Sequence, residues 1–207
     1  METNMEQPTT KGKRITLMLV ESALMIAIAT VCSLVKIDLP LGGGVTIVSM
    51  LPLVIISHRY GAPWGLLTAF VYSIGQMLLG LDNVAYADSF LMGAGIVMLD
   101  YILPYTVIGL SGIFGKKRSS VAIGIAVTFT LRFLCHLTAG AWIWGVWMPE
   151  QFMGLPMTNP WIYSALYNGW YMLIELIATE IVAMLIYSPL KQYFRGEQLQ
   201  PTQKPAE

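Results

Sequence analysis

Six apolar stretches follow one another along this chain, and they constrain its fold more than any other feature. A helix that crosses a lipid bilayer needs about 20 mostly apolar residues. The stretches, bounded by charged or turn residues, lie at 15–35, 45–57, 63–81, 88–114, 120–147 and 161–187. The second is the shortest. The sequence therefore predicts an all-α membrane protein with six transmembrane helices in a single domain over 1–207, with loose polar tails at 1–10 and 197–207.

Composition supports a membrane protein. Of the 207 residues, 56% are hydrophobic and 12% are charged, against roughly 25% charged in soluble domains. This balance excludes a disordered chain, a nucleic-acid-binding domain and an ordinary cytosolic enzyme. The sequence has no phosphate-binding loop, zinc-protease motif or hydrolase nucleophile motif, and Cys32 and Cys135 are too far apart for a metal-binding cysteine pair. We therefore expect no enzyme, no cofactor and no metal in this chain.

The basic residues predict how the chain is oriented. Those that precede the first stretch, separate the second from the third and the fourth from the fifth, or follow the sixth are Lys11, Lys13, Arg14, Arg59, Lys116, Lys117, Arg118, Lys191, Arg195 and Lys204. The connections on the other side, 37–44, 82–87 and 148–160, have no Lys or Arg. The positive-inside rule then predicts that both termini are cytoplasmic. Lys36, at the outer end of the first stretch, is the exception, and we expect it to snorkel.

Ionisable residues inside the predicted spans indicate function, because a charge in the bilayer is costly. Asp100 and His136 lie at the outer-to-middle level of two different predicted helices. Arg132 lies at middle depth, and the sequence leaves open whether it pairs with Asp100 or with Glu175. Glu21, nearer the cytoplasmic side, is predicted to be structural or to face a partner.

Further polar and aromatic residues are predicted at the same level as Asp100. Asn168 and Tyr163 belong to the outer half of the last stretch. Trp144 follows His136 by eight residues, about two helical turns, so both should lie on one face. Trp142 and Trp161 are equally well explained as members of an interfacial aromatic belt. A polar cluster that opens to the outside is suited to binding a solute that arrives from outside.

Three parts of the chain resemble a known family. They are 42–61 (GGGVTIVSMLPLVIISHRYG), 99–101 (LDY), and the pair 132–144 (RFLCHLTAGAWIW) and 159–169 (NPWIYSALYNG). They resemble the thiamine-specific substrate-binding (S) components of energy-coupling-factor vitamin transporters, and the resemblance covers about 15–190. It implies a multi-pass protein of the bacterial plasma membrane that binds thiamine. It also implies three partners, a transmembrane coupling subunit and two ATPases that hydrolyse ATP.

The resemblance also assigns residues. It places the thiamine pocket on Asp100, Tyr101, His136, Trp144, Tyr163 and Asn168, with Trp147 and Tyr72 as neighbours. It places the surface that docks on the coupling subunit on Ala23 and Ala27, whose spacing would let another helix approach closely; packing within the bundle would explain this pair equally well. Some members carry a Trp and a Glu in the outer loop after the first span. Here 39–49 reads LPLGGGVTIVS and offers neither, which puts one side of the pocket in doubt.

The chemistry of thiamine fits these residue types. Thiamine is a permanent thiazolium cation joined to an aminopyrimidine, and a desolvated cation needs a carboxylate or aromatic faces. Asp100 supplies the charge and Trp144 supplies a stacking surface. The side chains of Asn168, Tyr163 and Tyr101 can supply directional hydrogen bonds.

Two alternatives to a thiamine-binding subunit stay open on the sequence. The first is an S component for another vitamin, such as the precursor hydroxymethylpyrimidine or riboflavin. The second is a self-sufficient, proton-coupled secondary transporter in which Asp100, Glu175 and Arg132 relay protons.

Overall fold

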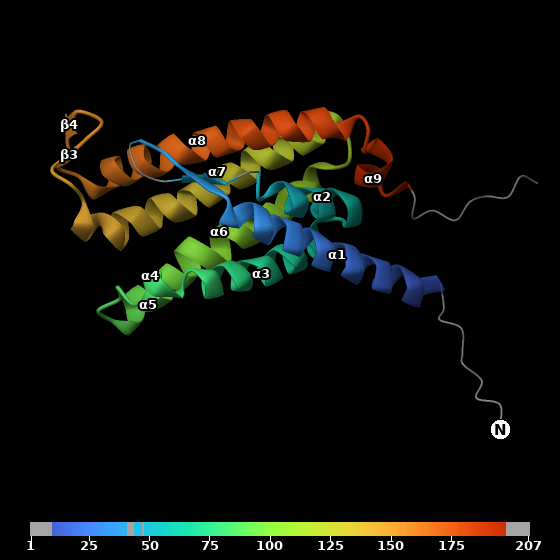
Figure 1. The fold of residues 1–207 in the computed structure, drawn as a ribbon, viewed down its shortest axis with the longest axis horizontal. Coiled ribbons are helices and arrows are strands. Elements are labelled where there is room, and N and C mark those ends of the chain that lie inside the picture. Colours follow the sequence, from blue (N-terminus) through green and yellow to red (C-terminus); the bar gives the residue numbers. More distant parts are fainter. Residues whose placement is uncertain (1–9, 41–43, 47, 198–207) are drawn as a thin grey trace, which may run out of the picture.

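The structure, a computed structural model, describes residues 10–40, 44–46 and 48–197, and it is a helical bundle (Figure 1). Within these residues, five helices are long and apolar enough to cross a membrane: Gly12–Leu34, Ala62–Leu79, Phe90–Phe114, Arg118–Trp142 and Pro160–Tyr187. They correspond to α1 (Thr10–Leu34), α3 (Ala62–Leu79), the composite helix described below, α7 (Arg118–Trp142) and α8 (Pro160–Tyr187). The prediction of an all-α membrane protein is thus confirmed.

The predicted second span differs from expectation. Its helix, α2 (Leu51–Tyr60), has ten residues, and nine of them are buried. Before it, β1 (Lys36–Asp38) pairs antiparallel with β2 (Gly44–Thr46). Pro52 favours a helix start at this point, while the β-branched Val45 and Thr46 favour the extended backbone of β2. Because α2 is too short to cross a bilayer alone, a sixth crossing stays a prediction.

The fourth span is one helical stretch of changing geometry. It runs through α5 (Phe90–Ile96), the π-helical η1 (Val97–Ile102), α6 (Leu103–Thr106) and the 3₁₀-helical η2 (Val107–Phe114). Pro104 lacks the N–H that would bond to the carbonyl of Asp100 in an α-helix, and its ring would clash there. The widened π turn accommodates this break, so Asp100 sits where the helix is distorted, as is frequent at functional sites.

Shorter elements complete the fold. They are α4 (Leu81–Val84), η3 (Trp144–Trp147), β3 (Gln151–Phe152), β4 (Leu155–Pro156) and α9 (Lys191–Arg195). Helix α9 ends at the same end of the bundle as α1 begins (Figure 1), as an even number of crossings requires. The cytoplasmic location of that end stays a prediction.

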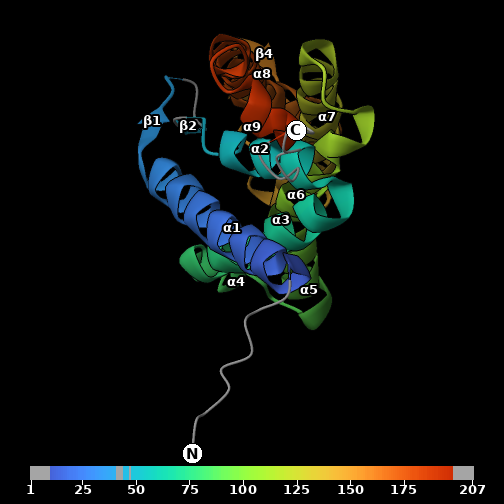
Figure 2. The same ribbon diagram turned by 90° about the vertical axis from the view of Figure 1, so that its right-hand side faces the viewer.

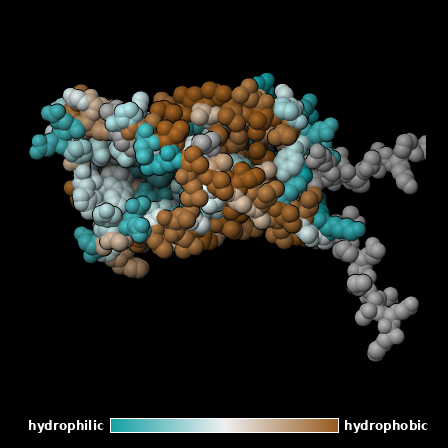
Figure 3. All heavy atoms as spheres, viewed as in Figure 1, coloured by the Kyte–Doolittle hydropathy of each residue, from teal (hydrophilic) through white to brown (hydrophobic). Residues whose placement is uncertain are grey.

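The two ends of the bundle are packed differently. The main core joins α2, the first half of α7, the far half of α8 and α9 with parts of α1, α3 and η2, and Leu53, Ile125 and Phe194 are among its fully buried side chains. The opposite end has only a small buried cluster around Ile96 and Tyr101. Apolar side chains cover the middle of the visible face between more polar ends (Figure 3), as a bilayer-spanning surface requires.

Candidate functional site

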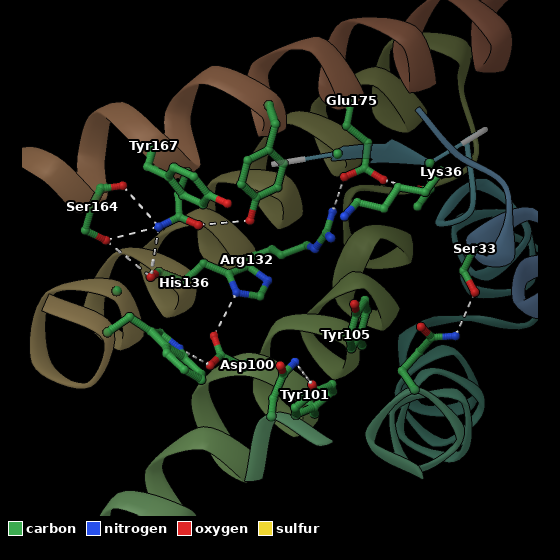
Figure 4. A pocket seen from close by; sticks show the side chains of 18 of the residues that line it. Ser33, Lys36, Asp100, Tyr101, Tyr105, Arg132, His136, Ser164, Tyr167 and Glu175 are labelled. Atoms are coloured by element: carbon green, nitrogen blue, oxygen red, sulfur yellow. Dashed lines mark hydrogen bonds and ion pairs between the residues drawn. The ribbon is translucent and has the colours of Figure 1, made fainter. Parts of the chain in front are cut away.

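A cavity of about 630 Å³ lies between the helices. It includes the end of the bundle that has the small buried cluster around Ile96 and Tyr101. Its lining extends from Trp144, Trp147 and Tyr163 to Arg132 and Glu175, which lie farther along α7 and α8. Figure 4 shows side chains that line the cavity. All of the binding residues named from the sequence line it: Tyr72, Asp100, Tyr101, His136, Trp144, Trp147, Tyr163 and Asn168. The structure thus brings these side chains together from α3, η1, α7, η3 and α8. Their binding of a ligand stays a prediction.

Asp100 lies in the part of the cavity that Trp144 and Trp147 line, which we call the outer part. Trp144 Nε1 donates to Asp100 Oδ2 over 2.7 Å, and His136 Nδ1 lies 3.2 Å from Asp100 Oδ1. Within the described residues, no Lys or Arg forms an ion pair with this carboxylate. Although α7 ends at Trp142, Trp144 still lies on the same side as His136. The site therefore presents a carboxylate held by nitrogen donors without a guanidinium or ammonium partner.

An aromatic group borders Asp100. The rings of Trp144 and Trp147 lie 5.6 Å apart, and the Tyr86 ring lies 6.1 Å from each of them. Indole faces are the most favourable aromatic surfaces for a cation. The sequence analysis did not identify Tyr86, because this residue lies in the predicted outer connection 82–87. Helical spacing does not predict the path of such a connection over the cavity.

The opposite wall comes from α8. Tyr163, Tyr167 and Tyr171 follow one another at intervals of one helical turn, with ring centroids 5.7 and 6.0 Å apart. Tyr167 and Tyr171 were also missed, although their spacing of four and eight residues from Tyr163 places them on one helix face. Asn168 donates to the His136 carbonyl over 3.3 Å and accepts from the Tyr171 hydroxyl over 2.9 Å. Asn168 thus joins α8 to α7 at the cavity wall.

Two of the predicted binding residues, Tyr101 and Tyr72, also make contacts that stabilise the fold. The Tyr101 hydroxyl donates to the Gly80 carbonyl over 2.9 Å and accepts from Asn83 over 2.7 Å, which ties η1 to the end of α3. Tyr72 is fully buried, and its ring packs edge-on against Tyr105 at 5.5 Å. Their rings line the cavity, and Tyr101 in addition fixes the helix that carries Asp100.

The deeper part of the cavity contains a complete ion pair. Arg132 Nη1 lies 2.6 Å from Glu175 Oε2, and both side chains are buried. Thr46 donates to Glu175 Oε1 over 2.5 Å. The Tyr105 ring lies 5.4 Å from the guanidinium carbon. The question left open by the sequence is settled: Arg132 pairs with Glu175, and no Lys or Arg in the described part of the chain pairs with Asp100.

Lys36, predicted to snorkel at the outer end of the first stretch, lines the cavity. Its ammonium lies 3.3 Å from Asp38, and about half of its side chain is exposed. Snorkelling stays a prediction. The cause of the lysine's position is the β1–β2 hairpin, which pairs Lys36 with Thr46. A Cβ at Gly44 would meet the Lys36 side chain, so the glycine leaves room for the lysine to lie along the hairpin.

Comparisons with known proteins show the family of this chain. Residues 19–195 match the family described as thiamine transporter protein (Thia_YuaJ). The chain belongs to this family. It is 31% identical over 195 residues to "Thiamine transporter ThiT" of Bacillus subtilis (strain 168), covering 86% of this chain and 94% of that protein. It is 26% identical over 159 residues to the protein of the same name from Lacticaseibacillus paracasei, covering 70% and 74%.

A solved structure has the same fold as this chain. The structure titled as ThiT from Listeria monocytogenes superposes with a TM-score of 0.64 at 23% identity, covering 90% of this chain and 98% of that one. The similarity extends over nearly the whole bundle, so the helices that surround the cavity belong to the shared fold.

The predicted docking residues on α1 are placed differently from the cavity residues. Ala23 and Ala27 are exposed, whereas Ala29 on the same helix is fully buried. Packing within the bundle therefore does not explain the Ala23–Ala27 pair. The Glu21 carboxylate already has partners within the protein, because Arg59, Tyr60 and Tyr193 all donate hydrogen bonds to it.

Proposed function

We propose that this protein is the thiamine-binding S component of an energy-coupling-factor importer in the bacterial plasma membrane. The observation that carries the proposal is the convergence of eight side chains, named from the sequence, on one cavity in a member of the thiamine transporter family. Asp100 provides the negative charge for the thiazolium, and the rings of Trp144, Trp147 and Tyr86 provide its aromatic surroundings.

The aminopyrimidine has polar groups that need directional partners. Tyr163 and Asn168 line the wall that faces Asp100, and the carbonyl and hydroxyl chemistry of these side chains suits ring nitrogens and an exocyclic amine. We expect the chain to bind its ligand without changing it chemically. The chain thus captures its ligand and leaves energy coupling to partners.

Delivery needs those partners. With both termini in the cytoplasm, the cavity opens outward, and α1 presents Ala23 and Ala27 to the lipid side, where a transmembrane coupling subunit bound to two ATPases docks. ATP hydrolysis in the ATPases then drives thiamine release to the cytoplasm.

Ligand titration tests the binding step. The purified chain is titrated with thiamine, hydroxymethylpyrimidine and riboflavin while tryptophan fluorescence is followed, because Trp144 and Trp147 line the cavity. We expect saturable quenching by thiamine at micromolar or lower concentration, and weaker binding of the pyrimidine, which lacks the cation. Preference for the pyrimidine or riboflavin would replace thiamine as the substrate, and no saturable change with any of them would refute the vitamin site.

Co-purification tests the docking step. Ala23→Trp places a bulky side chain on the exposed face of α1 and should abolish recovery of the coupling subunit and ATPases while thiamine binding is kept. Ala126→Trp, at an exposed alanine on α7, is the matched control and should retain the complex. Recovery of the ATPases with Ala23→Trp would refute this docking surface.

A further inference from the structure

A second cavity lies at the end of the bundle where α1 begins and α9 ends. It has a volume of about 280 Å³. Its lining, which we call the basic pocket, consists of Arg14, Arg59, Tyr60, Gly61, Lys116, Arg195 and Gly196. Four of these residues are cationic and none is acidic. They come from the start of α1, the α2–α3 turn, the η2–α7 turn and the end of α9. Figure 2 views the bundle from the end at which these segments lie.

Two of the four cations already have carboxylate partners. Arg59 donates to both oxygens of Glu21, over 2.6 and 3.0 Å. Arg195 lies 3.3 Å from Glu197, in a pair that is partly exposed. Within the described ranges 10–40, 44–46 and 48–197, no carboxylate forms an ion pair with Arg14 or Lys116. The basic pocket therefore retains positive charge that the described part of the protein does not neutralise.

Lys116 is held in position at this cavity. Its ammonium donates to the carbonyl of Arg59 over 3.2 Å and to that of Arg195 over 2.9 Å, so it joins two turns. Desolvation by burial lowers the pKa of Lys116, and repulsion from Arg59 and Arg14 lowers it further. Gly61 and Gly196 both have positive φ values, 93° and 65°, so the turns that form the rim depend on glycine. A fixed ammonium among like charges is suited to receive an anion.

The position of the basic pocket indicates the kind of anion. Its residues belong to the end of the bundle where α1 begins and α9 ends. This end is more polar than the apolar middle (Figure 3), and lipid headgroups meet a membrane protein at such a level. We propose that the basic pocket binds the phosphate group of an anionic phospholipid. Free phosphate offers the same chemistry, and the experiment below separates the two sources. The inference depends on the membrane setting of the bundle and not on which vitamin fills the larger cavity.

Thermal unfolding of the purified full-length chain in neutral detergent provides the test. Phosphatidylglycerol is added in one series, phosphatidylcholine with the same acyl chains in a second, and inorganic phosphate in a third. We expect phosphatidylglycerol to raise the unfolding temperature and phosphatidylcholine to leave it unchanged. Removing one cation should weaken the apparent affinity about five-fold, from the roughly 1 kcal/mol that each basic residue contributes near a membrane surface.

The variants are Arg14→Gln and Lys116→Gln, with Lys117→Gln as the matched control, since Lys117 is exposed and does not line the basic pocket. Arg14 is exposed, so Arg14→Gln keeps the test valid if Lys116→Gln fails to fold. Equal protection by both lipids, or a full phosphatidylglycerol response in Arg14→Gln, would overturn the proposal. Protection by inorganic phosphate alone, lost in Arg14→Gln, would support the site and assign it to the free anion. Thiamine titration of the same variants should match the unaltered chain.

Discussion

The outer and the deep parts of the large cavity each contain a carboxylate, and the two differ in burial and in partners: Glu175 is fully buried, whereas Asp100 is only partly buried. Glu175 in the deep part has Arg132 at 2.6 Å and a hydrogen bond from Thr46. Asp100 in the outer part has nitrogen donors from Trp144 and His136 and, among residues 10–40, 44–46 and 48–197, no Lys or Arg partner. A buried charge must be matched by a partner. The deep pair is complete without a ligand, whereas no Lys or Arg of the described residues pairs with Asp100; under the proposed function, that carboxylate faces the thiamine cation.

The largest expected effect comes from breaking the deep pair. Glu175→Gln leaves the Arg132 guanidinium buried without its counter-charge, and losing one partner of a buried pair costs about 3–5 kcal/mol. We therefore expect a large loss of stability, measured by thermal or denaturant unfolding in detergent. Glu180→Gln, at a half-buried carboxylate on the same helix, is the control and should cost much less.

The double variant Arg132→Met with Glu175→Leu sharpens this result. It removes both charges together, so it should recover most of the stability lost in Glu175→Gln, because buried pairs are often replaceable by apolar residues of similar size. If the double variant is no more stable than Glu175→Gln, the loss does not come from an unmatched charge, and the deep pair is more than a structural contact.

The next effect is on ligand binding at the outer carboxylate. Asp100→Asn keeps the side-chain shape and removes the negative charge, so thiamine affinity should fall by about 1–3 kcal/mol while stability changes less. Isothermal titration or tryptophan quenching measures the affinity. Asp88→Asn, at an exposed carboxylate near the start of α5, is the matched control. Unchanged affinity in Asp100→Asn would mean that the carboxylate serves only to hold Trp144 and His136.

The difference between the two regions also explains what the sequence could predict. The long helices follow from length and hydropathy alone, and Asp100, His136 and Trp144 stand out because polar and aromatic groups at one depth of apolar helices indicate a site. The partner of Arg132 could not be predicted, because both carboxylates lie within its reach along the bundle. Lys36 and Tyr86 were missed for a related reason: they lie on connections, and neither helical period nor charge pattern gives the path of a hairpin or a loop.

A smaller effect is expected from the aromatic group beside Asp100. Trp144→Phe keeps an aromatic ring but removes the indole N–H that donates to Asp100 over 2.7 Å. It also replaces the best cation-binding ring with a weaker one, so thiamine affinity should fall by about 0.5–2 kcal/mol. Trp161→Phe, at a half-exposed tryptophan at the start of α8, should bind thiamine normally. Equal affinities for the two variants would place thiamine away from the indole group.

The smallest effect concerns the link between the β1–β2 hairpin and the deep pair. Thr46→Val has nearly the same shape but cannot donate to Glu175, so stability should fall by about 1 kcal/mol. Thr130→Val, which removes only a bond from an exposed threonine to its own helix, is the control. The same hairpin places Lys36 at the cavity, so a loosened hairpin should also speed thiamine release, measured by stopped-flow fluorescence. Release at an unchanged rate, with stability lowered as expected, would show that the hairpin supports the deep pair without retaining the ligand.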